Sequence, residues 1–314
     1  MKCNAQLVDF FIGKPNRLIV ICSIDFMGQE LRLQAGLSKD AEMLGCYVGD
    51  NLRDIHSITA SGAMKVVWDK ETYDDAMASL GDVLPATDYD TFLALLKSGD
   101  KSVATQAKAL RNLSKSVNFG SAYGCEAPKM QELLVTDLPT ATGMLNAKLA
   151  KFWGYEQWKE RVEEEAMSAG YVATELGGRR HLQEAILADD KWRQQSAARQ
   201  ASNFKIQSAG AELAKKAMVR LWDSGIFFRL DAVFVAVIHD EVVWSVHRDH
   251  AYESIEVVWN AVSQPYTPDF PVPFLGSISL GPNFGQQYEA GEKPDAKVIA
   301  EILEKCRPKV PVTV

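Results

Sequence analysis

Two acidic positions that lie far apart in the sequence could together bind a metal ion. Asp240 belongs to the polar triplet His239-Asp240-Glu241. Asp25 directly follows the apolar run 18–24. Carboxylates between apolar segments are costly to bury unless a partner such as a metal ion balances their charge. Two aspartates that share divalent cations would provide the arrangement that two-metal phosphoryl transfer requires. A solvated hairpin turn would explain the polar triplet without any metal.

The segments around these acids favour β-structure. Residues 233–238 and 242–246 are rich in β-branched and aromatic residues, so they predict a tight hairpin with the polar triplet at its turn. The apolar run 18–24 predicts a further short strand that carries Asp25 at its end. A carboxylate at the end of that strand could share a divalent cation with Asp240.

A cation or an aromatic residue stands at every fourth position of a helix predicted for 105–123: Arg111, Lys115, Phe119 and Tyr123. Residues four apart lie on one face of a helix, so these side chains form a ladder. Gly120 and Gly124, beside the last two, would let another group approach closely. A solvated basic edge that runs into a pair of core aromatics would show the same pattern.

The helix predicted for 191–222 carries a second ladder, which is polar: Arg199, Asn203 and Gln207. Ordinary solvent exposure would explain it, and so would a groove that holds a nucleic-acid backbone. Region 65–104 is broken by glycine and proline and predicts a surface elaboration with one or two short helices. Periodicity predicts further helices at 54–63, 148–167, 249–262 and 295–306, and strands at 171–174 and, as an edge strand, 273–280.

The composition is that of a soluble globular protein, with 314 residues of which 47% are hydrophobic and 24% charged. The net charge of −7 gives no global signal for nucleic acid, so a DNA site would have to be a local patch. The five cysteines show no Cys-x-x-Cys spacing, which argues against a zinc site or a disulfide framework and favours a reducing compartment. No apolar run near the N-terminus is long enough for a membrane span, so a cytoplasmic location with no membrane partner is expected.

Three motifs, in this order, resemble the polymerase motifs of A-family DNA polymerases, the group of bacterial DNA polymerase I and many phage polymerases. They are Asp25-x-x-x-x-Glu30-Leu31-Arg32, Arg111-x-x-x-Lys115-x-x-x-Phe119-Gly120-x-x-Tyr123-Gly124 and His239-Asp240-Glu241. Supporting matches are Asp54-Ile55-His56, the 199/203/207 ladder and the segment from Val272-Pro273 to Phe284. The resemblance covers residues 18–288, and its second motif is specific.

The resemblance implies an α+β right-hand fold, in which a palm of antiparallel sheet and helices joins mainly helical fingers. The expected spans are palm 1–57 and 185–288, fingers 58–184 with the insertion 65–104, and a C-terminal tail 289–314. The activity implied is template-directed DNA synthesis, in which deoxynucleotides are added to a primer 3′-hydroxyl.

The resemblance also assigns roles to the residues of the motifs. Asp25, Asp240 and the backbone carbonyl of Phe26 would bind two Mg²⁺ ions, or Mn²⁺, and Glu241 would support this metal site. One ion would activate the primer hydroxyl and the other would neutralise the leaving pyrophosphate. Lys115 would be a candidate general acid for pyrophosphate.

The contacts with substrate follow from the same resemblance. The residues expected to bind the incoming dNTP are Glu30, His56, Arg111, Lys115, Phe119 and Tyr123. Glu30 would fill the space that a ribose 2′-hydroxyl needs, which favours DNA synthesis and opposes a reverse transcriptase or an RNA polymerase. The residues expected to contact primer–template DNA are Arg199, Asn203, Gln207 and His239, the last at the primer terminus.

Several positions depart from the family pattern. Gly28 stands where the family has a glutamine, so one contact with DNA is expected to be missing. Phe26 lacks the hydroxyl of the usual tyrosine, which helps to hold Glu30, so sugar discrimination is expected to be weaker. Lys205 replaces a common proline.

The family's exonuclease, its thumb and the palm segment before the first motif have no counterpart in this sequence. Two explanations are an unusually small polymerase and one half of a split phage polymerase that acts in the host cytoplasm, and the second is the expectation. A second polypeptide would carry the thumb and could also carry the 3′→5′ exonuclease. The strand at 18–24 would then leave an apolar or strand-edge surface for that partner, with 1–17 and 289–314 as docking elements. The alternative is a non-catalytic DNA-binding or assembly subunit that retains the fold.

Overall fold

The structure, a computed structural model, describes residues 19–81 and 85–306. The chain divides into two compact units, each of which is described here by itself. The sheet unit comprises residues 1–29 and 208–314, and the helical unit comprises residues 30–207. The expected docking segment 1–17 lies outside the described residues. The palm and fingers spans expected from the sequence end at other positions than these units, and they stay a prediction.

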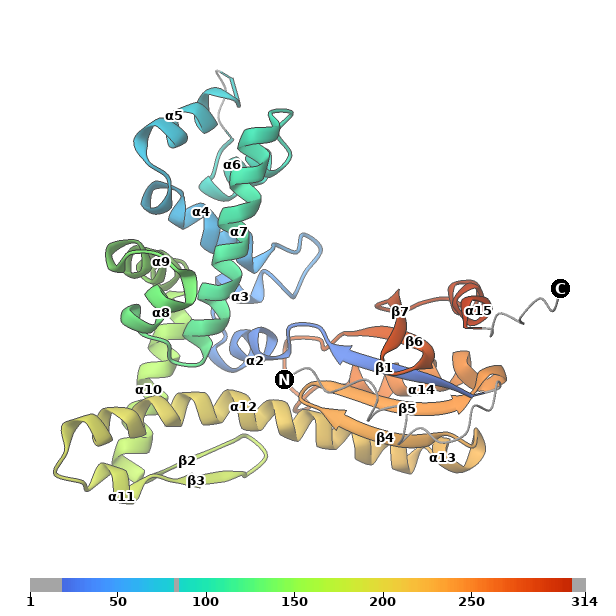
Figure 1. The fold of residues 1–314 in the computed structure, drawn as a ribbon. Helices are drawn as coiled ribbons and strands as arrows, with labels where there is room; N and C mark the ends of the chain where they lie inside the picture. The colour runs from blue at the N-terminus through green and yellow to red at the C-terminus, as the bar shows by residue number, and fades with distance from the viewer. Residues whose placement is uncertain (1–18, 82–84, 307–314) are drawn as a thin grey trace. The chain divides into compact units, whose positions relative to one another are not determined.

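The sheet unit is built on five antiparallel strands in the order β4-β5-β1-β6-β7 (Figure 1). Their bounds are β1 Ile19–Phe26, β4 Val233–Ile238, β5 Glu241–His247, β6 Gly276–Asn283 and β7 Gln286–Gly291. β1 is buried from residue 20 to residue 24, as expected for a strand that is covered on both faces. The prediction of an exposed edge at the first strand is therefore wrong.

The prediction of an edge strand at 273–280 is also wrong, because β6 lies between β1 and β7. The edges of the sheet are β4 and β7. β7 falls partly in the segment that the sequence analysis assigns to the C-terminal tail. A short strand after a turn gives almost no periodic signal of its own, which explains why the sequence did not reveal it.

Helical segments of the same unit pack against this sheet. The bounds are α13 Ile226–Arg229, the 3₁₀ turn η1 Arg248–His250, α14 Ala251–Val262 and α15 Ala296–Lys305. α14 packs against β1, β5 and β6, and the Trp244 indole of β5 donates a hydrogen bond of 3.1 Å to the hydroxyl of Ser254 on α14. α15 packs against β6 and β7. Within the described ranges, no helix is both long and apolar enough to cross a membrane.

The helical unit contains most of the remaining helices and a small hairpin. Its helices are α2 Gln29–Ser38, α3 Ala41–Leu44, α4 Ile55–Val67, α5 Lys70–Ala78, α6 Asp88–Leu96, α7 Lys101–Ala122, α8 Ala127–Leu134, α9 Leu138–Lys151, α10 Trp153–Ala169, α11 Gln183–Ile186 and the first part of α12 Lys191–Asp223. The hairpin pairs β2 Tyr171–Ala173 with β3 Arg179–His181. The two short helices expected in the insertion 65–104 are α5 and α6.

The single helix predicted for 148–167 is wrong. Two helices, α9 and α10, meet instead at Phe152, whose side chain is fully buried. The strand β3 was not predicted from the sequence. At both positions the backbone conformation depends on packing against a neighbouring segment rather than on the local sequence pattern.

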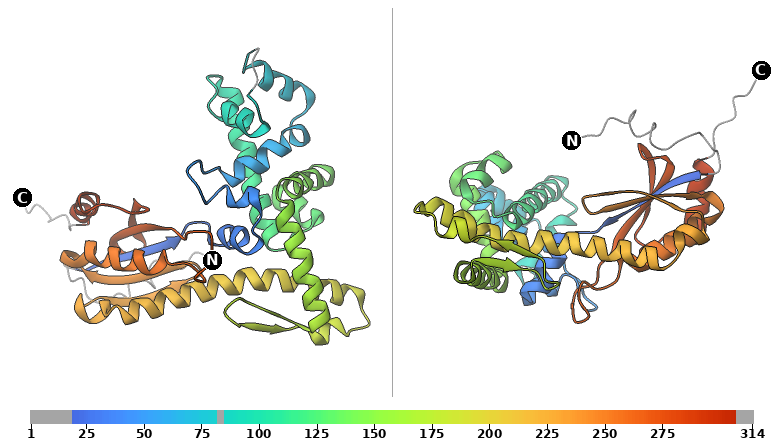
Figure 2. Two further views of the ribbon diagram at one scale, coloured as in Figure 1. Left: turned by 180° about the vertical axis from the view of Figure 1, so that it is seen from behind. Right: turned by 90° about the horizontal axis from the view of Figure 1, so that it is seen from below.

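α4 lies at the centre of the helical unit. It packs against both α7 and α9, which gather around it in Figure 2. Its buried face includes Ala60, Ala63 and Met64, and the two alanines keep that face narrow where the other helices approach. Asp54 begins the helix, because its carboxylate accepts a hydrogen bond of 2.9 Å from the backbone N–H of Ser57.

A lysine is buried between α9 and α10. The Nζ atom of Lys148 lies 3.9 Å from a carboxylate oxygen of Glu156 and 4.7 Å from the centre of the Tyr155 ring. No hydrogen-bond partner of this Nζ is found within the described part of the chain. Burial lowers the pKa of Lys148 to about 8, although Glu156 opposes the shift.

Lys148 should make stability depend on pH. Its folded-state pKa of about 8 lies below the ordinary value of 10.5, so between these values the unfolded chain binds more protons. The free energy of unfolding should therefore rise with pH across this window. Lys148→Met should remove this dependence and raise the free energy of unfolding at neutral pH by about 1–3 kcal/mol, because burial disfavours the charged ammonium and Glu156 keeps Lys159 as a second partner.

Denaturant unfolding at neutral pH and at about pH 9.5 measures both effects. The matched control is Lys159→Met, since Lys159 also lies 3.9 Å from Glu156 but is partly exposed. The control should change stability little. A loss of more than about 1 kcal/mol in Lys148→Met would show that the ion pair stabilises the fold.

Candidate active site

The sheet brings the sequence-distant acids together. In the pairing of β1 with β5, Asp25 lies directly opposite Glu241. The backbone N–H of Phe26 donates a hydrogen bond of 3.0 Å to the carbonyl of Asp240. The strand pairing therefore sets the acidic residues of the first strand and of the hairpin beside one another, and the divalent cation that they are expected to share stays a prediction.

The three carboxylates affect one another. The Asp25 side chain keeps contact with solvent, yet its partial burial raises its pKa to about 6, and repulsion from Asp240 and then from Glu241 adds to the shift. A cation between these groups would offset that repulsion. No set of three or more His, Cys, Asp or Glu side chains suited to a metal ion occurs among the described residues. Mg²⁺ commonly takes only one or two protein carboxylates and completes its shell with phosphate and water, so the donors on β1 and the hairpin fit it.

Two turns at this end of the sheet use the left-handed backbone region. His239, at the tip of the hairpin, has φ +58° and an exposed side chain. Gly28, in the turn between β1 and α2, has φ +62°, a conformation that glycine adopts without strain. The backbone of this turn therefore explains the glycine that departs from the family pattern.

The predicted ladder on α7 forms and faces solvent. Lys115, Phe119 and Tyr123 are exposed, and Arg111 is partly exposed. Other positions of the same helix, such as Leu110 and Val117, are buried. The ladder is thus an accessible face with two cations followed by two aromatic rings.

Arg111 is held in place by Asp54. Its Nε and Nη2 atoms donate to the two carboxylate oxygens of Asp54 over 2.7 and 2.9 Å. Burial alone would raise the pKa of Asp54, but the hydrogen bonds from Arg111 and Ser57 hold it below the ordinary value. The N-cap of α4 therefore also orients the first cation of the α7 ladder.

His56 lies beside the same ladder. Its ring centre is 5.8 Å from that of Phe119, and its Nδ1 is 3.0 Å from the amide nitrogen of Asn118. Burial lowers the pKa of His56 to about 4. Asp54 opposes this shift, while Arg111 and Lys115 reinforce it. His56 is therefore neutral at physiological pH.

Glu30 and the polar ladder of α12 meet the end of α7. The Tyr123 hydroxyl donates to a carboxylate oxygen of Glu30 over 2.6 Å, and Asn203 donates to the backbone carbonyl of Tyr123 over 3.0 Å. Arg199 pairs with Glu126 at 2.9 Å. Gln207 is exposed on α12. Asn203 thus contacts protein in this structure, which the sequence did not indicate.

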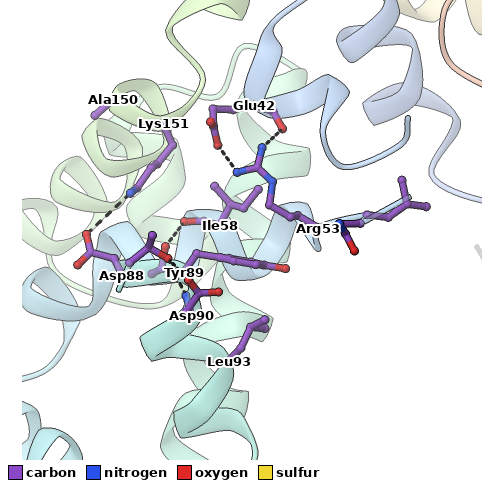
Figure 3. A pocket seen from close by; sticks show the side chains of 13 residues that line it. Glu42, Arg53, Ile58, Asp88, Tyr89, Asp90, Leu93, Ala150 and Lys151 are labelled. Atoms are coloured by element: carbon purple, nitrogen blue, oxygen red, sulfur yellow. Dashed lines mark hydrogen bonds and ion pairs between the residues drawn. The ribbon is translucent and has the colours of Figure 1, made fainter. Parts of the chain in front are cut away.

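A cavity of about 820 Å³ lies beside α4 and α6, apart from the α7 ladder (Figure 3). Its cations are paired with acids: Arg53 with Glu42 at 2.7 Å and Lys151 with Asp88 at 3.9 Å. Tyr89, on α6 of the insertion, lines this cavity and accepts a hydrogen bond of 2.9 Å from the backbone N–H of residue 54. The insertion thus supports the N-terminus of α4.

Sequence reasoning missed three supporting residues: the Asp54 carboxylate, Tyr89 and Asn118. The only available signal was a polar side chain, Asn118, on the side of α7 away from the ladder. Buried amides usually have specific partners, so this position could have been singled out. The partners themselves lie on other helices and could not be read from the pattern.

Comparison with known proteins identifies relatives of this chain. The family profile described as DNA polymerase family A matches residues 89–286, which is more than half of the chain. Over 163 residues the chain is 31% identical to the thermostable DNA polymerase I of Thermus filiformis, covering 52% of this chain and 19% of that protein. It is 25% identical to the DNA polymerase of Mycobacterium phage L5, covering 88% of this chain and 36% of the phage protein.

The fold agrees with these matches. The polymerase domain of Pol1 from M. smegmatis, solved with DNA primer-template and dNTP, superposes with a TM-score of 0.65 at 23% identity. The alignment covers 85% of this chain and 40% of that chain. The chain therefore has the α+β polymerase fold expected from the sequence, while it spans only 19% and 36% of the two polymerases named above. On the match of the family profile, the chain belongs to DNA polymerase family A.

Proposed function

We propose that this chain is the catalytic part of a template-directed DNA polymerase, which adds deoxynucleotides to the 3′-hydroxyl of a primer. The observation that carries the proposal is the pairing of β1 with β5, which sets Asp25 opposite Glu241 and beside the backbone of Asp240. A subunit that only bound DNA would have no need to keep mutually repelling carboxylates at one end of a sheet.

In this proposal the sheet unit supplies the metal-binding groups. Asp25, Asp240 and the backbone carbonyl of Phe26 would hold two Mg²⁺ ions, or Mn²⁺, and Glu241 would support the site. Bound divalent ions supply activation of the primer hydroxyl and neutralisation of the charge on the leaving pyrophosphate. The raised pKa of Asp25 supports this assignment, because it records a site in which added positive charge would be favourable.

The helical unit would supply the groups that bind the triphosphate. Arg111 offers two donors, and Lys115 offers a mobile point charge that could also protonate the leaving pyrophosphate. Phe119 and Tyr123 would lie against the nucleotide. The position of these side chains on one face supports these roles, because Lys115, Phe119 and Tyr123 are exposed and Arg111 is partly exposed.

DNA contacts complete the proposal. Arg199, Asn203 and Gln207 would contact primer and template, and the exposed His239 would contact the primer terminus. The M. smegmatis domain was solved with such a primer-template. Since the relatives come from bacteria and a mycobacterial phage, we place the reaction in a bacterial cytoplasm.

The first test removes one metal ligand at a time. Asp25→Asn and Asp240→Asn should each reduce nucleotide incorporation at least 10³-fold, on the order of 4 kcal/mol, because each removes a charge that two-metal chemistry needs. Primer–template binding and the thermal unfolding midpoint should remain close to wild type. The matched control is Asp269→Asn, an exposed aspartate of the same unit. Primer extension at near wild-type rate in either variant would overturn the metal assignment.

Glu30 is proposed to exclude ribonucleotides by occupying the space of the 2′-hydroxyl. The hydrogen bond from Tyr123 supports this role, because it holds the Glu30 carboxylate in one position. The Tyr123 hydroxyl therefore supports Glu30 in place of the tyrosine hydroxyl that Phe26 lacks.

Two variants test this gate. Glu30→Ala should raise the use of ribonucleotides relative to deoxynucleotides at least tenfold, and Tyr123→Phe should raise it by a smaller factor, since only the hydrogen bond is lost. Single-nucleotide incorporation kinetics with both sugars give the ratio. Unchanged discrimination in both variants would show that this carboxylate does not face the sugar.

We further propose that a second polypeptide binds the β4 face of the sheet unit, defined as strand β4 with Trp222 and Phe228 beside it. All six residues of β4 are apolar, and four of them are exposed. Trp222 is 63% exposed and Phe228 is 79% exposed. An apolar patch of this kind marks an interaction surface or an aggregation hazard.

The geometry of the β4 face indicates what would bind there. β4 is an edge of the sheet, so along its outer side the backbone groups have no strand partner in the described part of the chain. An apolar cavity of about 520 Å³ lies between the end of α12 and the start of β4, and its lining includes Met218, Phe227 and Phe234. A strand-forming polypeptide segment with one large apolar side chain fits both features. Such a partner would carry the thumb, as expected from the sequence, and could also carry a 3′→5′ exonuclease.

This proposal is tested by producing the chain together with the polypeptide encoded beside its gene and analysing the complex by native mass spectrometry. Val235→Lys places a charge on β4 and should weaken the complex at least tenfold. Leu187→Lys, an exposed apolar position of the helical unit, is the matched control and should leave it intact. A homodimer through β4 would overturn the proposal. So would an isolated monomer whose β4 amides are already protected from hydrogen exchange.

A further inference from the structure

The side-chain amide of Asn118 joins α7 to the first turns of α4. Asn118 is fully buried and directly precedes Phe119 in the α7 ladder. Its Oδ1 accepts a hydrogen bond of 2.8 Å from the hydroxyl of Thr59. Its Nδ2 lies 3.4 Å from the carbonyl of Ile55 and 3.0 Å from Nδ1 of His56.

These contacts determine which way the amide points. The amide atom beside His56 also faces the carbonyl oxygen of Ile55, where an oxygen would be repelled and an N–H group donates. The Thr59 hydroxyl lies 2.8 Å from the amide oxygen of Asn118 and 3.2 Å from the carbonyl of Ile55, and it donates its one proton to the nearer acceptor, the amide oxygen. The NH₂ group therefore faces His56, and Nδ1 of His56 is the acceptor.

An acceptor at Nδ1 fixes the tautomer of His56. A neutral imidazole that accepts at one nitrogen carries its proton on the other, so His56 carries its proton on Nε2. Burial is the largest cause that keeps the ring neutral. Of the charged groups around His56, Asp54 favours the protonated ring, whereas Arg111 and Lys115 oppose it. A second proton at Nδ1 would have to displace the hydrogen bond from Asn118.

We propose that Asn118 is a positioning residue, which fixes His56 as a neutral Nε2–H donor for the phosphates of the incoming nucleotide. Arg111 and Lys115 would then supply the positive charge, while His56 supplies a directed hydrogen bond that does not vary with pH. The identity of the acceptor rests on the proposed polymerase function. The tautomer of His56 and the role of Asn118 do not.

The tautomer is measured directly by ¹⁵N NMR of the imidazole nitrogens in the metal-free chain, with His56→Gln used to assign the signals. The wild-type signal should show the Nε2–H tautomer and no titration between about pH 5 and 8. Asn118→Asp replaces the donor with an acceptor, so His56 should become protonated at Nδ1 and titrate at or above its ordinary range. Ser114→Ala is the control, because Ser114 is buried one turn earlier on α7 and its hydroxyl has no partner among the described residues.

Nucleotide binding provides the second readout. In the wild-type chain, the KM for dNTP should not change through titration of His56 between about pH 5.5 and 8. In Asn118→Asp, the KM should change with pH in this range because His56 then titrates. His56→Gln, whose amide can place a donor near the Nε2 position, should change KM less than about threefold. His56→Asn cannot reach that position and should raise KM roughly tenfold or more, as expected when a hydrogen bond to a charged group is lost.

Each result either supports or overturns the proposal. An Nδ1–H tautomer in the wild-type chain, or titration of wild-type His56 near its ordinary pKa, overturns it. If Asn118→Asp does not fold, Thr59→Val removes the hydroxyl that orients the amide, and His56 should then populate both tautomers. Unchanged tautomers in that variant overturn the proposal as well. A chain that shows the expected tautomer but no incorporation would contradict the polymerase function and leave the role of Asn118 in place.

Discussion

The register between β1 and β5 runs from Ile19 opposite His247 to Asp25 opposite Glu241, and the carboxylate arrangement depends on it. Successive residues of a strand point to opposite faces, so a shift of one position would carry Asp25 to the other face of the sheet. Residues 20–24 are all buried, and a shifted register would expose part of that apolar run. The apolar interior of β1 therefore fixes the position of a charged group that the sheet itself would disfavour. The repulsion among the acids is a local cost that the burial of the strand offsets.

In the helical unit, an ion pair rather than strand register positions a charged side chain. Asp54 caps α4 and at the same time binds Arg111, so the start of one helix determines where the first cation of α7 lies. Asn118 also links these two helices, because its buried side-chain amide on α7 contacts Thr59 and His56 on α4. The exposed ladder of α7 is thus oriented by polar contacts on its inner side. Under the proposed function, a substitution among those inner residues would alter nucleotide binding without any direct contact with the nucleotide.

The sequence predicted the elements whose signals are local. The β-branched runs around Asp240, the four-residue ladder of α7 and the helix that begins at Asp54 all appear where their patterns place them. The errors concern relations between segments. A strand's own residues do not reveal whether it lies at the edge or the centre of a sheet, which explains the wrong positions of β1 and β6. The break at Phe152 and the partners of Asn118 depend on other helices and carry no signal in the sequence pattern.

Residue 26 is a phenylalanine where the family usually has a tyrosine, and contacts with other segments change what this difference means for Glu30. The sequence alone indicates that Phe26 removes one support of Glu30. In the structure, the ring of Phe26 is buried and packs edge to face against Phe274, with the ring centres 6.4 Å apart. This site is apolar, so an added hydroxyl would need a hydrogen-bond partner of its own. Glu30 meanwhile accepts a hydrogen bond from Tyr123, a residue of the α7 ladder. The position of the carboxylate therefore depends on the end of α7, and Asn203 holds the backbone of that same tyrosine. If the proposed role of Glu30 holds, selection among sugars would respond to changes along α12 as well as to residue 26.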